Sequence, residues 1–187
     1  LYNRALSPTE ITKLYEYAPG PVAYWNFEEN TGTTAKDTSG NNNNATFGTG
    51  NSAPTWSVGA NSKGAGLNLD GNDYVSINDS SSLKPTSSIT VESWFITSDR
   101  TISQRMVSKT EGSGYQLSLN ENNQCGSNTF CFVLNIGGTY YTATYPVSNL
   151  SNNVWYHSTG VYDGKTVKLY LNGSQVGTTS TVSGSIT

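Results

Sequence analysis

Acidic and amide side chains gather between residues 28 and 44 of the chain. Glu28, Glu29, Asp37, Asn41 and Asn43 lie in this polar, turn-rich stretch. Hard cations such as Ca2+ take several oxygen ligands at once, from carboxylates, amide side chains and backbone carbonyls, usually on loops. The stretch is therefore a candidate calcium site. An Asx-rich turn, whose side chains bond only the local backbone, explains the same residues, and the sequence leaves both interpretations open.

Side chains that could carry out catalysis are few. His157 is the only histidine, and it lies in the middle of an expected strand beside Trp155, where we expect a buried, hydrogen-bonded structural role. A glycosidase needs two carboxylates at one cleft. Glu28 and Glu29 are adjacent, so on a strand they would face opposite ways. The sequence therefore predicts that the protein is not an enzyme.

The two cysteines, Cys125 and Cys131, flank Gly-Ser-Asn-Thr-Phe at an expected hairpin tip. A loop that short brings the two Cα atoms within disulfide reach, and a disulfide would place the protein outside the reducing cytoplasm. Two free thiols are the alternative. A structural zinc site is not expected, because it needs four ligands and the chain offers two cysteines and one histidine.

The composition limits the fold and the partners. The chain of 187 residues is long enough for one β-sandwich with a full core. Only 12% of its residues are charged, and Gly, Asn, Ser and Thr dominate, which is typical of short strands joined by polar turns. The net charge of −3 provides no basic field for nucleic acid or an anionic membrane. No stretch approaches the roughly 18 apolar residues of a spanning helix, so we expect no nucleic-acid partner and no membrane insertion.

The clearest strand pattern runs over residues 154–177. Alternating side chains over 155–162 and 166–171 predict two strands, and Asp163-Gly164 and Asn172-Gly173 predict tight hairpin turns. Together they indicate an antiparallel meander. Apolar residues on both faces of Ser88–Ile96 predict a strand that is covered on each side. Further strands are expected at 106–108, 115–119, 130–136 and 140–145, with a strand–turn–strand unit at 66–77.

Three motifs in the meander resemble the signature of laminin-G-like, concanavalin A-like jelly-roll domains: Trp155-Tyr156-His157, Tyr162-Asp163-Gly164 and Leu169-Tyr170-Leu171-Asn172-Gly173. Ser158 and Thr159 stand where that pattern prefers Val and Ala. Val22–Glu29 is similar to the first strand of the family. The resemblance implies an all-β fold, an antiparallel jelly-roll β-sandwich over residues 21–187.

The resemblance also implies a ligand and a metal. Members of the family often hold a structural calcium ion near the first polar loop, completed by an acidic residue of the last strand. Their commonest suggested role is sugar binding, which aromatic side chains near polar loops would serve, and burial in the core is the alternative for each such residue. The E-x-D-x-x-E strand of the family's glucanases has no counterpart here. The candidate aromatic residues are Tyr140, Tyr141, Trp56 and Trp94.

The sequence pattern of residues 1–20 differs from that of the rest of the chain. Ser7-Pro8-Thr9-Glu10 is a capping box with proline at the first helical position, and it predicts a short helix from about Pro8 to Tyr17. Leu1–Ser7 is similar to the end of a laminin-G-like domain. Residues 1–20 are therefore expected to be the last strand and helix of a neighbouring repeat plus a linker, and residues 21–187 a domain without its own last strand.

This arrangement indicates a non-catalytic, extracellular binding or adhesion module from a bacterial multi-repeat surface or secreted protein. The expected partner is a glycan or surface polysaccharide. The alternative is a structural repeat that assembles with neighbouring copies of the same domain. Residues 1–18 are expected to dock where a terminal strand and helix belong, either on their own sandwich or on the next copy. A severed remnant that docks nowhere is the alternative.

Overall fold

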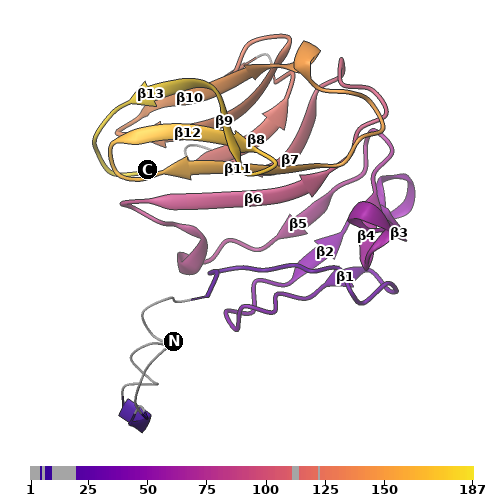
Figure 1. The fold of residues 1–187 in the computed structure, drawn as a ribbon. Coiled ribbons are helices and arrows are strands. Elements are labelled where there is room, and N and C mark those ends of the chain that lie inside the picture. The colour runs from indigo at the N-terminus through magenta and orange to yellow at the C-terminus, as the bar shows by residue number, and fades with distance from the viewer. Residues whose placement is uncertain (1–4, 6, 10–19, 111–113, 122) are drawn as a thin grey trace. The chain divides into compact units, whose positions relative to one another are not determined.

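The computed structural model describes residues 5, 7–9, 20–110, 114–121 and 123–187. They form thirteen β-strands and four 3-10 turns (Figure 1). Every strand pairing among them is antiparallel, which confirms the predicted all-β class. The chain divides into two compact units. Unit 1 comprises residues 1–58 and 64–83, and unit 2 comprises residues 59–63 and 84–187.

The predicted N-terminal helix is not supported. Of its residues, only Pro8 and Thr9 are described, both in helical conformation, and the described part of the chain contains no α-helix. The docking of residues 1–18 and the domain boundary at residue 20 fall on a segment that lies largely outside the described residues, so both stay predictions. No helix within the described ranges is long and apolar enough to cross a membrane.

Unit 1 is built from five short strands. Strands β1, β2 and β5 form one sheet in that order, and β3 pairs with β4. Phe47 is buried at the centre of a small core, and its ring lies 5.2 Å from that of Trp56. Val22–Glu29 is not a strand, because only an isolated bridge joins Trp25 to Asp37. The bounds are Thr34–Ala35 (β1), Ala45–Phe47 (β2), Thr55–Val58 (β3), Ala65–Asn68 (β4) and Val75–Ile77 (β5).

Unit 2 is a sandwich of two four-stranded sheets, in the orders β10-β9-β8-β7 and β13-β12-β11-β6 (Figure 1). One continuous core joins them, with fully buried Leu117 and Phe132 from the first sheet and Val167 and Leu169 from the second. The predicted strands are confirmed within one or two residues. The bounds are Ile89–Phe95 (β6), Gln104–Lys109 (β7), Tyr115–Leu119 (β8), Thr129–Ile136 (β9), Thr139–Pro146 (β10), Tyr156–Tyr162 (β11), Thr166–Leu171 (β12) and Ser174–Thr181 (β13).

The two predicted hairpin turns of the meander form, but one is centred differently. Asn172 and Gly173 both have positive φ, 49° and 79°, as a two-residue type I′ loop requires. In the other turn the central pair is Gly164-Lys165, not Asp163-Gly164, because the Asp163 N–H donates to the Thr166 carbonyl. Asp163 acts through its carboxylate instead, which accepts the N–H groups of Lys165 and Thr166 at 3.0 and 2.8 Å.

The structure corrects two further expectations about local structure. The strands of the expected strand–turn–strand unit at 66–77 form, as β4 and β5, but they do not pair with each other, because β4 pairs with β3 and β5 pairs with β2. Strand β6 is the last strand of its sheet, and only its inner face is covered: Glu92 and Trp94 on the other face are exposed. Alternation alone does not distinguish an apolar residue that enters a core from one that faces solvent.

One edge of the sandwich is closed by hydroxyl groups. Thr178 Oγ1 of β13 accepts the Thr144 N–H of β10 at 2.9 Å, and Ser180 Oγ donates to the Thr142 carbonyl at 2.6 Å. A Cβ at Gly177 would lie 1.9 Å from the Thr144 carbonyl oxygen, so only glycine allows this approach. The hydroxyls satisfy backbone groups of an edge strand that would otherwise be open to pairing.

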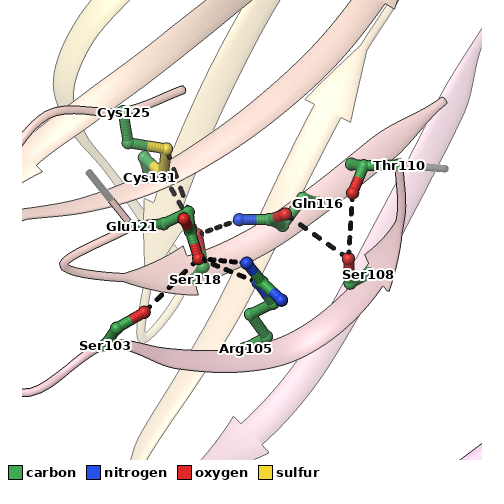
Figure 2. A network of polar contacts seen from close by, with 9 residues as sticks. All are labelled: Ser103, Arg105, Ser108, Thr110, Gln116, Ser118, Glu121, Cys125 and Cys131. Carbon is green, nitrogen blue, oxygen red and sulfur yellow. Dashed lines mark hydrogen bonds and ion pairs between the residues drawn. A yellow bond between two sulfur atoms is a disulfide. The ribbon is translucent and has the colours of Figure 1, made fainter. Parts of the chain in front are cut away.

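The predicted disulfide between Cys125 and Cys131 is confirmed, with the two Cα atoms 6.1 Å apart. Beside it, a polar network covers the outward face of β7 and β8 (Figure 2). Gln116 and Ser118 are almost fully buried and are joined by a 2.8 Å bond from Gln116 Nε2. Arg105 binds the buried Glu121 carboxylate through Nε at 2.8 Å and through a second guanidinium nitrogen at 2.7 Å. Each buried polar group thereby gains a partner, as burial requires.

Candidate functional site

A row of three side chains crosses the outward face of the sheet that contains β6, β11 and β12. Trp94 of β6 is directly opposite His157 of β11. His157 in turn exchanges two hydrogen bonds with Asn172: the Asn172 N–H donates to the His157 carbonyl at 2.8 Å, and the His157 N–H donates to Asn172 Oδ1 at 2.9 Å. Because the neighbouring Phe95, Ser158 and Leu171 are buried in the sandwich, the row points to solvent.

This row forms one side of an open hollow of about 540 Å3. Trp155, directly before β11, shares its face with His157 because the two residues are two positions apart. The Trp94 side chain is half exposed, and its ring centroid lies 5.1 Å from that of His157 with the planes tilted by 47°. The residues that line the hollow are Asn61, Trp94, Trp155, His157, Asn172 and Gly173.

The hollow also presents hydrogen-bond donors. Three groups donate no hydrogen bond to any residue within the described ranges: the indole N–H groups of Trp94 and Trp155 and the amide nitrogen of Asn172. None of these nitrogens is among the buried atoms that lack a partner. They are therefore open to solvent. Aromatic faces combined with a few free polar groups are typical of small-molecule sites.

His157 does not have the buried role expected from the sequence. Its side chain is 27% exposed, and Nε2 lies 3.6 Å from the Glu92 carboxylate, which is 58% exposed. The alternation over residues 155–162 already placed Trp155 and His157 on one face. The alternation did not say whether this face points to solvent or to the core. The small residues Ser158 and Gly160 on the opposite face are the signal that the opposite face is the one packed against the second sheet.

The aromatic residues predicted to bind a ligand are placed differently. Trp56 packs on Phe47 in the core of unit 1, and its indole N–H donates to the Gly32 carbonyl at 2.8 Å. Tyr140 and Tyr141 are consecutive residues of β10 and so face opposite sides of the sheet. Tyr140 is 37% exposed, whereas Tyr141 packs against the core of unit 2. Only Trp94 among the four candidates lies at the hollow.

The predicted metal ligands of unit 1 are largely occupied by protein hydrogen bonds. The Asp37 carboxylate accepts three backbone N–H groups, from Tyr24, Ser39 and Asn43, each at 2.9 Å. Burial raises the pKa of Asp37, but these bonds and one from the Ser39 side chain outweigh it and bring the pKa to about 2. Asp37 therefore organises the loop directly, as the Asx-turn interpretation expects.

The other four predicted ligands add only one free buried oxygen. Asn41 and Asn43 both donate their amide nitrogens to the Val22 carbonyl, at 3.1 and 3.0 Å. Glu28 is exposed, and Glu29 accepts the Lys36 N–H through Oε1 while its buried Oε2 has no partner within the described residues. No group of three or more acidic, histidine or cysteine side chains in the described part of the chain could hold a metal ion. Most of the predicted ligands thus bind other groups of the protein, and calcium binding at this loop stays a prediction.

The comparison with known families agrees with this geometry. A family model described as the concanavalin A-like lectin/glucanases superfamily, of the laminin G type, matches residues 69–187, which is more than half of the chain. The chain belongs to this superfamily. The match confirms the resemblance seen in the meander motifs and includes every strand of unit 2. No curated protein matches the chain significantly.

Proposed function

We propose that this superfamily domain is a non-catalytic carbohydrate-binding module, and that the hollow around Trp94, Trp155, His157 and Asn172 is its binding site. The observation that carries the proposal is the convergence of three aromatic rings and an unpaired amide on one open surface of unit 2. A monosaccharide ring has an apolar face and a rim of hydroxyls. The indole faces suit the first, and the free N–H groups suit the second.

The exposure of these residues supports a binding role. Trp94 is 51% exposed, and Ile96, two positions further along the chain, is 42% exposed. Exposed apolar side chains that are grouped on one surface mark interaction sites, whereas singly scattered ones need no explanation. The disulfide and the superfamily support a secreted or cell-surface location for the protein.

Glycan binding by tryptophan variants tests the proposal. We expect Trp94→Ala and Trp155→Ala each to weaken binding of the best oligosaccharide found on a glycan array at least about tenfold, which is about 1.4 kcal/mol, because each removes a stacking surface. Tyr140→Ala is the matched control, since it removes an exposed aromatic ring from the other sheet of unit 2. Isothermal titration calorimetry gives the affinities, and melting curves verify that each variant is folded.

The second candidate function is assembly with copies of the same domain, and the same exposed apolar group favours it. If the glycan array shows no binding while light scattering shows self-association that Trp94→Ala abolishes, the hollow is a protein interface. Equal sugar affinity in Trp94→Ala, Trp155→Ala and the wild type would contradict the proposed site.

A further inference from the structure

Among the described residues, Glu92 is the one acidic residue that forms an ion pair with a residue lining the hollow. Glu92 precedes Trp94 by two positions on β6 and therefore faces the same side. Its carboxylate lies 3.6 Å from His157 Nε2 and remains 58% exposed, so the side chain is not withdrawn into the protein. A ligand that stacks on the Trp94 and His157 rings would lie close to this charge.

Glu92 forms no ion pair with a lysine or arginine in the described part of the chain. The lining residues include neither lysine nor arginine. On β11 the residue opposite Glu92 is Thr159, and the residue opposite Thr159 on β12 is Tyr170. Lys168 is nearer the other end of β12, where its Nζ is held by Asp163 at 2.9 Å. Glu92 is therefore the charged side chain that the described contacts place at the hollow.

From this charge distribution we propose that Glu92 sets the charge selectivity of the hollow: it favours neutral and amino sugars and disfavours anionic sugars such as uronates. The inference rests on the proposed sugar-binding function and adds the class of ligand. A carboxylate on the ligand would be repelled by Glu92, whereas an ammonium group would be attracted to it. Both effects are moderate because the site is open to water and salt.

Matched ligands that differ only in charge test this selectivity. The probes are a neutral oligosaccharide that binds the wild type, its counterpart oxidised to a carboxylate at C6, and its counterpart with a free amine at C2. For the wild type we expect the affinities to rank amino above neutral above acidic, with the acidic form about three- to tenfold weaker than the neutral one. In Glu92→Gln the three affinities should converge, mainly through a gain for the acidic ligand.

Asp163→Asn is the control variant, because it changes the net charge by the same unit at the far end of β11. It should leave the ranking intact. Raising the salt concentration should reduce the differences among the three affinities of the wild type. It should have little effect on those of Glu92→Gln.

The outcomes separate this inference from the proposed function. If the wild type binds neutral sugars but Glu92→Gln leaves the acidic-to-neutral ratio unchanged, the selectivity role is overturned and the binding function stands. Equal wild-type affinity for neutral and acidic forms overturns it as well. If no sugar of any charge binds, the proposed function fails and the selectivity role fails with it.

Discussion

At the scale of single residues, Asp37 shows how a turn can be built around one carboxylate. Its two oxygens accept the backbone N–H groups of Tyr24, which precedes it by 13 positions, and of Ser39 and Asn43, which follow it by 2 and 6 positions. Hydrogen bonds to the charged form stabilise ionisation even where burial opposes it. The same oxygens that made Asp37 a candidate metal ligand are therefore largely committed to the backbone.

The depressed pKa of Asp37 predicts an acid-dependent loss of stability. An aspartate in the unfolded chain titrates near 3.9, whereas Asp37 in the folded protein titrates at about 2. The folded state therefore gains roughly 2 kcal/mol at neutral pH, and this gain is lost as the pH falls from about 4 to about 2. Asp37→Asn should remove most of this gain at pH 7 and make little difference at pH 2. Urea unfolding of the wild type and of Asp37→Asn between pH 2 and pH 7 measures the difference in their free energies of unfolding. A difference that does not change with pH would contradict the lowered pKa of Asp37.

At the scale of elements, Gly160 decides how closely β11 packs on β9. A Cβ at this position would lie 2.3 Å from ring carbons of Phe132, which is fully buried in the core. Gly160 stands among larger β-forming residues, so its place in a strand follows from this contact and not from propensity. Because Gly160 has no side chain, the Phe132 ring of β9 can lie against the backbone of β11 in the opposite sheet.

Gly160→Ala should therefore destabilise the protein by about 1–3 kcal/mol through overpacking. Gly20→Ala is the control, because nothing lies within 4 Å of a Cβ there, and it should change stability by less than about 0.5 kcal/mol. Adding Phe132→Leu to Gly160→Ala should cost less than Phe132→Leu costs in the wild type, since the smaller side chain relieves the clash. Chemical unfolding gives all four free energies, and strictly additive effects would show that the two residues do not meet.

At the scale of the whole molecule, the calcium prediction made from the family resemblance is tested by melting. If the loop of residues 28–44 binds calcium in the folded state alone, a hundredfold excess over Kd adds about 2.7 kcal/mol of stability. Chelation should then lower the melting temperature, and Asp37→Ala should abolish the difference. Identical curves in calcium and in chelator would show that the hydrogen bonds of Asp37 are sufficient to hold the loop.

Local chemistry in the sequence determined much of unit 2. Alternation predicted the strands of the meander, Asn172-Gly173 predicted its turn because both residues tolerate positive φ, and the short spacing of Cys125 and Cys131 predicted their disulfide. These features depend on neighbours within a few residues, so the sequence contains them directly. The family motifs reached further: they predicted the sandwich, which the two four-stranded sheets confirm.

Only the tertiary structure decided which faces are buried and which residues meet. Trp94 and His157 come from segments far apart in the chain, and the register between β6 and β11 brings them together. The same alternation that predicts a strand is satisfied whether Trp94 enters a core or faces water, because a period of two does not say which side the second sheet covers. Packing settles this: Ser158 and Gly160 leave room for the opposing sheet, and the aromatic residues are left on the outside.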